Sequence, residues 1–277
     1  MSRISRAVLI RLRRGIVSMR FLTCAVVCAL FMIFFIYNDY AAEYQGFGLY
    51  YFLQGVDHSG ADRLLLMITV FPVATMFCDD RESGMIKFLL PREGKNGYSL
   101  SLTLSAGVTS GMCMFLAYMI FSAFILIKYP LVPTLDAENI GYLLYSFPNG
   151  ELLGNGHAPL CYFLYFLTKG ALASFYGMLA ALQSVIITDR RFSVISPIIM
   201  NAVISFAGSL LRSPAFLDPN AVFSGHTGLY TSFGGSLDNI SFSPITALYP
   251  LIFCTVTAVL TALCISQLLK IKVEAKI

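Results

Sequence analysis

Two groups of residues have side-chain types that catalysis or metal binding requires, but neither has the right arrangement. Asp57, His58 and Ser59 carry the residue types of a hydrolase triad, yet adjacency in sequence does not give triad geometry. Cys24 and Cys28 stand four apart, and the seven cysteines of the chain contain no C-x-x-C pair, which argues against a disulfide framework or a zinc site. We therefore expect no catalytic site and no metal site.

The phosphate-binding loop of ATPases, G-x-x-x-x-G-K-[ST], is missing as well. Its nearest approach is Gly94-Lys95, which continues to Asn96 and lacks the upstream glycine. We expect no cofactor on this chain, so any ATP that drives it must be hydrolysed by a partner. An intramembrane enzyme is disfavoured because no nucleophile, base or metal ligands are clustered.

One short charged segment has residues that suit a contact with another protein. Residues 78–98 read CDDRESGMIKFLLPREGKNGY, with acids first, then the helix-compatible MIKFLL, then Pro91, Gly94 and Gly97. Apolar side chains ringed by charges are typical of a protein contact surface. The alternative is a solvated turn whose apolar residues dip into lipid. The residues expected to make the contact are Arg81, Glu82, Gly84, Ile86, Lys87, Phe88, Leu89, Leu90 and Arg92.

The elements that must position this segment are membrane helices, as the composition indicates. Hydrophobic residues make up 57% and charged residues 12% of the chain, against about 45–50% and 25% in soluble domains. A bilayer solvates apolar side chains directly, whereas water does not. The net charge of +4 is small, so we expect no nucleic-acid partner. The sequence therefore predicts an all-α membrane protein.

Six stretches are apolar enough to cross a hydrocarbon core of about 30 Å, which takes roughly 17 to 25 helical residues. They are continuously apolar rather than alternating, which favours helices over a β-barrel. Prolines inside the spans are expected to kink these helices without ending them. The predicted spans are 21–37, the short 64–78, one within 98–127, one within 158–188, 192–211 and one within 239–269.

Lys and Arg are distributed unevenly over the connecting segments, and this distribution biases insertion. All but four of the 19 Lys and Arg residues lie on one predicted side, the four being Arg63, Lys128, Lys169 and Arg212. Because basic loops stay in the cytoplasm, both termini are predicted to lie on the cytoplasmic side. The protein itself is predicted to lie in the plasma membrane. Within the six-span domain 21–277, the outward segments are 38–60, 128–157 and 212–238, and segment 79–97 faces the cytoplasm.

The first twenty residues carry a helical apolar stripe with arginines largely opposite. The stripe consists of Ile4, Val8, Leu12 and Ile16. This spacing predicts an amphipathic helix within residues 1–20 that lies on the inner leaflet of the membrane. The alternative is a basic tail that only sets the topology.

Lys169 is the one charge well inside a predicted span, where it would cost about 2.5–3.5 kcal/mol at the bilayer centre. With residues 170–188 as the hydrophobic part of the fourth span, we expect Lys169 to reach the outer surface by snorkelling. The alternative is a pairing or substrate-facing role. Gln183, Asn201 and Thr257 are candidate pore-lining groups, with ordinary hydrogen bonding between helices as the alternative.

The order of these features resembles the ABC type-2 exporter permeases. The similarity is carried by two spans followed by Glu82-Ser83-Gly84, a Leu-Leu pair, Pro91-Arg92, and Tyr98 at the start of a long third span. Ser99 follows that tyrosine, where a lysine is frequent in the family. The resemblance implies that segment 79–97 is a coupling helix seated in a groove of a separate ABC ATPase. It also implies that ATP and Mg are bound by that partner, and that two permease copies, identical or related, form a dimer.

We therefore expect the membrane-spanning permease subunit of an ATP-driven exporter, a transporter component rather than an enzyme. The alternative is a secondary transporter or channel without an ATPase partner. That class usually places ionisable residues inside the membrane, and the predicted spans offer only Lys169.

Overall fold

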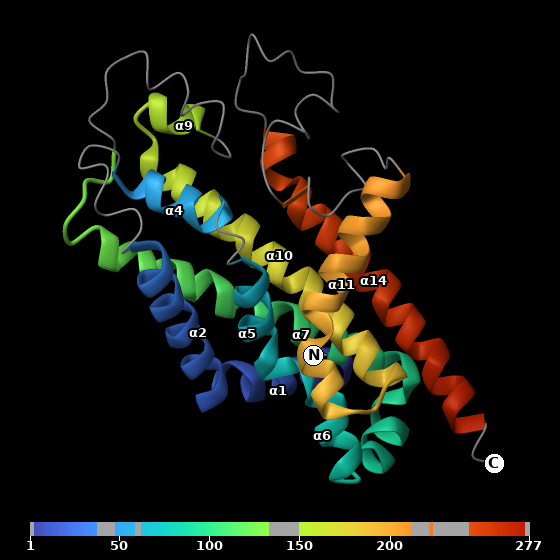
Figure 1. Ribbon diagram of the computed structural model, residues 1–277. Helices are drawn as coiled ribbons and strands as arrows, with labels where there is room; N and C mark the ends of the chain where they lie inside the picture. The colour runs from blue at the N-terminus through green and yellow to red at the C-terminus, as the bar shows by residue number, and fades with distance from the viewer. Residues whose placement is uncertain are drawn as a thin grey trace.

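The computed structural model describes residues 3–37, 48–58, 62–132, 150–211, 222–223 and 244–274, and this part of the chain is all-α. Figure 1 shows the helices as a bundle of oblique elements. They are α1 (Arg3–Ile16), α2 (Met19–Met32), the π-helix η1 (Ile33–Tyr37), α4 (Gly48–His58), α5 (Asp62–Ala74), α6 (Met76–Glu82), α7 (Ile86–Ile125), α9 (Glu151–Gly154), α10 (Ala158–Ile186), α11 (Arg190–Leu211) and α14 (Pro244–Glu274).

Four helical stretches in the described residues are long and apolar enough to cross a membrane, the pattern of a multi-pass membrane protein. They overlap the first, third, fourth and sixth predicted spans, although the second of them begins earlier, within segment 79–97. Prolines lie inside α5, α11 and α14 without ending them, as predicted. The four stretches are Met19–Ile36, Ile86–Leu126, Ala158–Ile186 and Leu248–Ile271.

The second and fifth predicted spans are helical but are not among these four long apolar stretches. Residues 64–78 fall in α5 and α6, which are separated at Thr75. α5 has thirteen residues, or about 20 Å of helix, too short to cross a bilayer alone. Residues 192–211 lie in α11, which packs against α5 and α10 but is not one of the four long apolar stretches.

α4, whose residues belong to the predicted outward segment 38–60, packs into the bundle. Leu53 and Val56 are fully buried. At its beginning, the Leu49 N–H donates to the Pro130 carbonyl just past the C-terminal end of α7, at 3.1 Å. At the opposite end of the bundle from the beginning of α4, α6 lies near the start of α11, where the Asp79 carboxylate is 3.6 Å from the Arg190 guanidinium. α5 and α6 follow one another directly at Thr75 and pack against each other.

The centre of the bundle is the pair α7 and α10, whose backbones approach closely at small residues. A Cβ on Gly111 would lie 2.1 Å from the Ser174 Oγ and 2.8 Å from the Gly170 carbonyl oxygen. A Cβ on Gly177 would lie 2.9 Å from the carbonyl oxygen of Ala106. Membrane helices lack a hydrophobic drive to associate, so close backbone packing of this kind holds them together.

Gly111→Val is therefore expected to separate α7 from α10. It should lower the free energy of unfolding by about 1–3 kcal/mol, the usual cost of overpacking. Thermal unfolding of the purified protein in mild detergent measures the effect. Met112→Val is the matched control, because Met112 is 46% exposed on the same helix. Equal melting temperatures for the two variants would contradict this packing.

Candidate functional site

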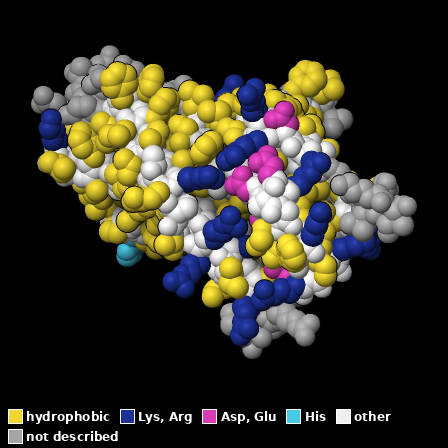
Figure 2. Space-filling model, turned by 90° about the horizontal axis from the view of Figure 1, so that it is seen from below, with side chains coloured by type: hydrophobic (Ala, Val, Ile, Leu, Met, Phe, Trp, Pro, Cys, Tyr) yellow, Lys and Arg dark blue, Asp and Glu magenta, His cyan; other side chains and the backbone are white. Residues whose placement is uncertain are grey.

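Charged side chains gather at one end of the bundle, where α1, α6, residues 86–95 and the start of α11 meet (Figure 2). Basic side chains dominate this face, with a few acidic ones between them, and apolar side chains cover much of the rest of the view. We call this region the charged end. It contains the predicted contact segment 79–97.

Two glycines give segment 79–97 its shape. α6 ends at Glu82, and Gly84 then turns the chain with φ of 72°. Residues 86–93 form a short helix, which Gly94 ends with φ of 73° and ψ of 160° before the long part of α7 begins. Positive φ favours glycine because it has no Cβ. Residues 86–93 are therefore a separate short helix at the charged end.

The side chains of this segment divide into an inward and an outward set. Ile86, Leu89 and Leu90 are half-buried and pack against the core. Phe88 is 74% exposed, an unusual position for a large aromatic side chain surrounded by charges. The charged side chains of the predicted contact set are also exposed. They are Arg81, Glu82, Lys87 and Arg92.

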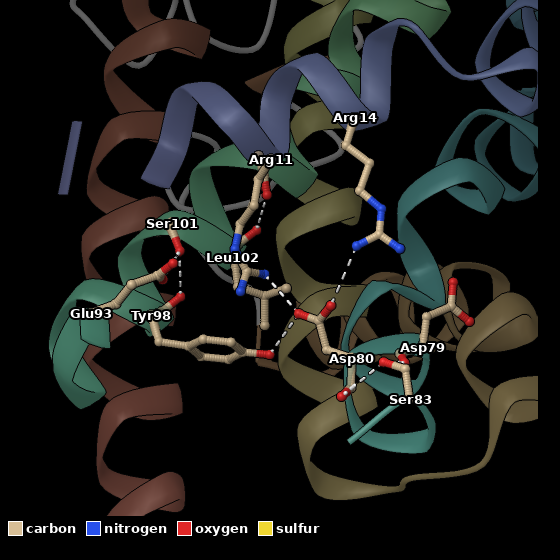
Figure 3. Close-up of polar contacts among 10 residues, drawn as sticks. Arg11, Arg14, Asp79, Asp80, Ser83, Glu93, Tyr98, Ser101 and Leu102 are labelled. Atoms are coloured by element: carbon tan, nitrogen blue, oxygen red, sulfur yellow. Dashed lines mark hydrogen bonds and ion pairs between the residues drawn. The ribbon is translucent and has the colours of Figure 1, made fainter. Parts of the chain in front are cut away.

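One acid of the segment, Asp80, faces inward and fastens it to α1. Asp80 is 5% exposed, and its carboxylate lies 3.1 Å from the Arg11 guanidinium and 3.7 Å from that of Arg14. The Tyr98 hydroxyl donates to Asp80 Oδ2 at 3.1 Å, and Arg11 lies over the Tyr98 ring at 4.4 Å (Figure 3). The carboxylate thus joins α1, α6 and α7.

Asp79 makes a second set of links from the same turn of α6. Its carboxylate lies 3.5 Å from Arg20 at the start of α2 and 3.6 Å from Arg190 at the start of α11. Sequence reasoning placed both aspartates in the segment but assigned them no role. The available signal was a pair of adjacent acids on the same predicted side as a helix rich in arginine.

The expected snorkelling of Lys169 is wrong. This residue is 4% exposed, and its Nζ lies 2.5 Å from Asp57 Oδ1 and 5.2 Å from the centre of the Tyr165 ring. The Tyr165 hydroxyl donates to Asp57 Oδ2 at 3.0 Å. Lys169 lies well inside α10 and stays buried because Asp57, near the end of α4, supplies a counter-charge that the sequence analysis placed in an outward loop.

The three other candidate polar residues have separate surroundings. Asn201 is buried and accepts a hydrogen bond from the Tyr176 hydroxyl at 2.9 Å, which joins α11 to α10. Thr257 is half-buried and donates to the carbonyl of Phe253 in its own helix. Gln183 is also half-buried, near the end of α10. Of the three, Asn201 makes a hydrogen bond between two helices, and Thr257 makes one within its own helix.

Comparisons with protein-family models, with curated proteins and with solved structures gave no match. In the described ranges, no three His, Cys, Asp or Glu side chains are grouped so that they could hold a metal ion.

Proposed function

We propose that this chain is the membrane-spanning permease subunit of an ATP-driven ABC exporter. The observation that supports this most strongly is the short helix 86–93, which stands between two glycine turns and presents Phe88 among exposed charges. An aromatic anchor surrounded by polar groups is typical of a protein interface. The partner is an ABC ATPase that binds ATP and Mg.

In this proposal the chain crosses the plasma membrane six times, with α4, α5 and α6 together providing the second span and α11 the fifth. The charged end faces the cytoplasm, as the accumulation of Lys and Arg favours. Both termini lie on that side, and α1 lies along the inner leaflet. A second permease copy, identical or related, completes the translocation path.

The links of Asp79 and Asp80 suggest how movement of the partner would reach the membrane. A displacement of segment 79–97 would be passed to α1 through Arg11 and to α11 through Arg190. The Asp80–Arg11 pair is buried whereas Asp79 and Arg190 are partly exposed, so we expect α1 to follow the segment more closely than α11. Closure of the partner ATPases would thus shift several helices at once and open a path outward.

A second candidate is favoured by one specific observation, the buried pair of Lys169 and Asp57. Secondary transporters often place ionisable residues at the ends of discontinuous helices, and Asp57 is the last residue but one of α4. In that case no ATPase would be needed. The double variant described in the Discussion separates the two candidates.

Affinity purification in mild detergent tests the leading proposal. We expect an ATP-hydrolysing polypeptide to purify with the wild-type chain in a fixed ratio, and vanadate-sensitive ATPase activity to elute with the complex. Purification of this chain without any ATP-hydrolysing polypeptide, from its native membrane, would overturn the proposal.

A further inference from the structure

A cavity of about 950 Å³ lies at the charged end, between α1 and segment 79–97. Its volume is within the range of small-ligand sites, about 300–1,000 Å³. Five arginines and three carboxylates are among its lining residues, which leaves an excess of positive charge. The arginines are Arg6, Arg11, Arg14, Arg20 and Arg92.

Several guanidinium groups of this cavity remain available for a ligand. The carboxylates Asp79 and Asp80 pair with Arg11, Arg14 and Arg20. Arg6 and Arg92 make no ion pair with any residue that the structure describes. The Nη2 atom of Arg11 is buried and, within the same residues, makes no hydrogen bond. A buried charged donor without an acceptor is costly, and an anion bound there would satisfy it.

Apart from Ser18 and Gly15, the rest of the lining is apolar and therefore unsuited to a small inorganic anion alone. Ile10 and Met19 contribute from α1 and the start of α2, Met76 from α6, and Met85 and Leu89 from segment 79–97. Methionine adapts readily to irregular apolar ligands. The ligand should therefore carry a negative group and an apolar part side by side.

We propose that this cavity binds the headgroup of an anionic phospholipid of the inner leaflet, with its phosphate on Arg6, Arg11 and Arg92. Planar guanidinium groups suit phosphate oxygens, and basic pockets on the cytoplasmic side of membrane proteins bind anionic headgroups. The proposal rests on the proposed function only in that α1 must lie at the inner membrane surface. A bound lipid would bridge α1 to the segment that contacts the ATPase.

The test uses the purified chain alone in mild detergent, so that its failure leaves the co-purification result unaffected. Binding of dioctanoyl phosphatidylglycerol is measured by native mass spectrometry, with dioctanoyl phosphatidylcholine and inorganic phosphate as comparisons. The variant is Arg6→Gln/Arg92→Gln. Its matched control is Arg81→Gln/Arg191→Gln, since both of these arginines are exposed at the same end and neither is among the cavity's lining residues.

We expect the wild type and the control to bind one phosphatidylglycerol, and the cavity variant to bind it roughly tenfold more weakly or worse, a loss of about 1.4 kcal/mol. Phosphatidylcholine and phosphate should compete poorly. Unchanged binding by the cavity variant would overturn the site. Equal binding of phosphatidylcholine would overturn recognition of charge, and equal competition by phosphate would overturn recognition of a lipid.

Discussion

Phe88→Asp is expected to leave the chain folded in the membrane while removing the ATPase that purifies with it. Phe88 is 74% exposed, so its replacement should change stability by no more than about 0.5 kcal/mol. A central aromatic anchor of an interface typically contributes about 2 kcal/mol or more, which corresponds to a roughly thirtyfold loss of affinity. The measurement is the ATPase activity recovered per mole of the purified chain.

Ile127→Asp provides the matched control for this variant. Ile127 is 78% exposed and follows the other end of α7, where the proposal places no ATPase. Its complex should therefore be recovered as fully as that of the wild type. A Phe88→Asp chain that retains the ATPase at wild-type ratio would show that the short helix 86–93 is not the contact.

Asp57→Ala is expected to have the largest effect on stability, because it leaves Lys169 buried without its counter-charge. Breaking one side of a buried ion pair typically costs about 3–5 kcal/mol. Thermal unfolding in detergent and the yield of monodisperse protein measure the loss. Replacing both residues, as Asp57→Leu/Lys169→Met, should recover most of the stability, since an apolar pair of similar size is often neutral. Tyr165 keeps an acceptor in the double variant, the Leu53 carbonyl at 3.3 Å.

The same double variant separates the two candidate functions. If an ATPase drives transport and the ion pair only holds α4 against α10, the double variant should transport at close to the wild-type rate. If the pair binds an ion or a substrate, the double variant should fold and yet fail to transport. A double variant that remains as unstable as Asp57→Ala would contradict the pairing itself.

The long helices could be predicted from the sequence because their signal is local. Uninterrupted apolar runs require only a bilayer to become helices. α10 falls within the predicted range 158–188, and α14 begins within the predicted range 239–269 and continues to Glu274. The short helix 86–93 could also be anticipated, since the glycines at both of its ends are visible in the sequence. In these regions, neighbouring residues alone determine the local structure.

The contacts that fasten the segment depend on residues far apart in the chain. Asp80 was seen only as one acid of a charged stretch, although its partners Arg11 and Tyr98 both lie in the sequence. Lys169 is expected at the outer surface because residues 170–188 make a complete hydrophobic span without it, and its partner Asp57 stands far earlier in the chain. Tertiary pairing overrides the expected snorkelling, and a single sequence carries no signal for such pairs.

The most direct test of the proposed orientation is chemical labelling of segment 79–97 from each side of the membrane. Lys87→Cys is introduced together with Cys264→Ser, because Cys264 is the exposed member of the seven free cysteines. A membrane-impermeant maleimide should label Lys87→Cys in inside-out vesicles and not in intact cells, whereas Lys128→Cys should show the opposite pattern. Labelling of Lys87→Cys from the outside of intact cells would contradict both the topology and the contact with a cytoplasmic ATPase.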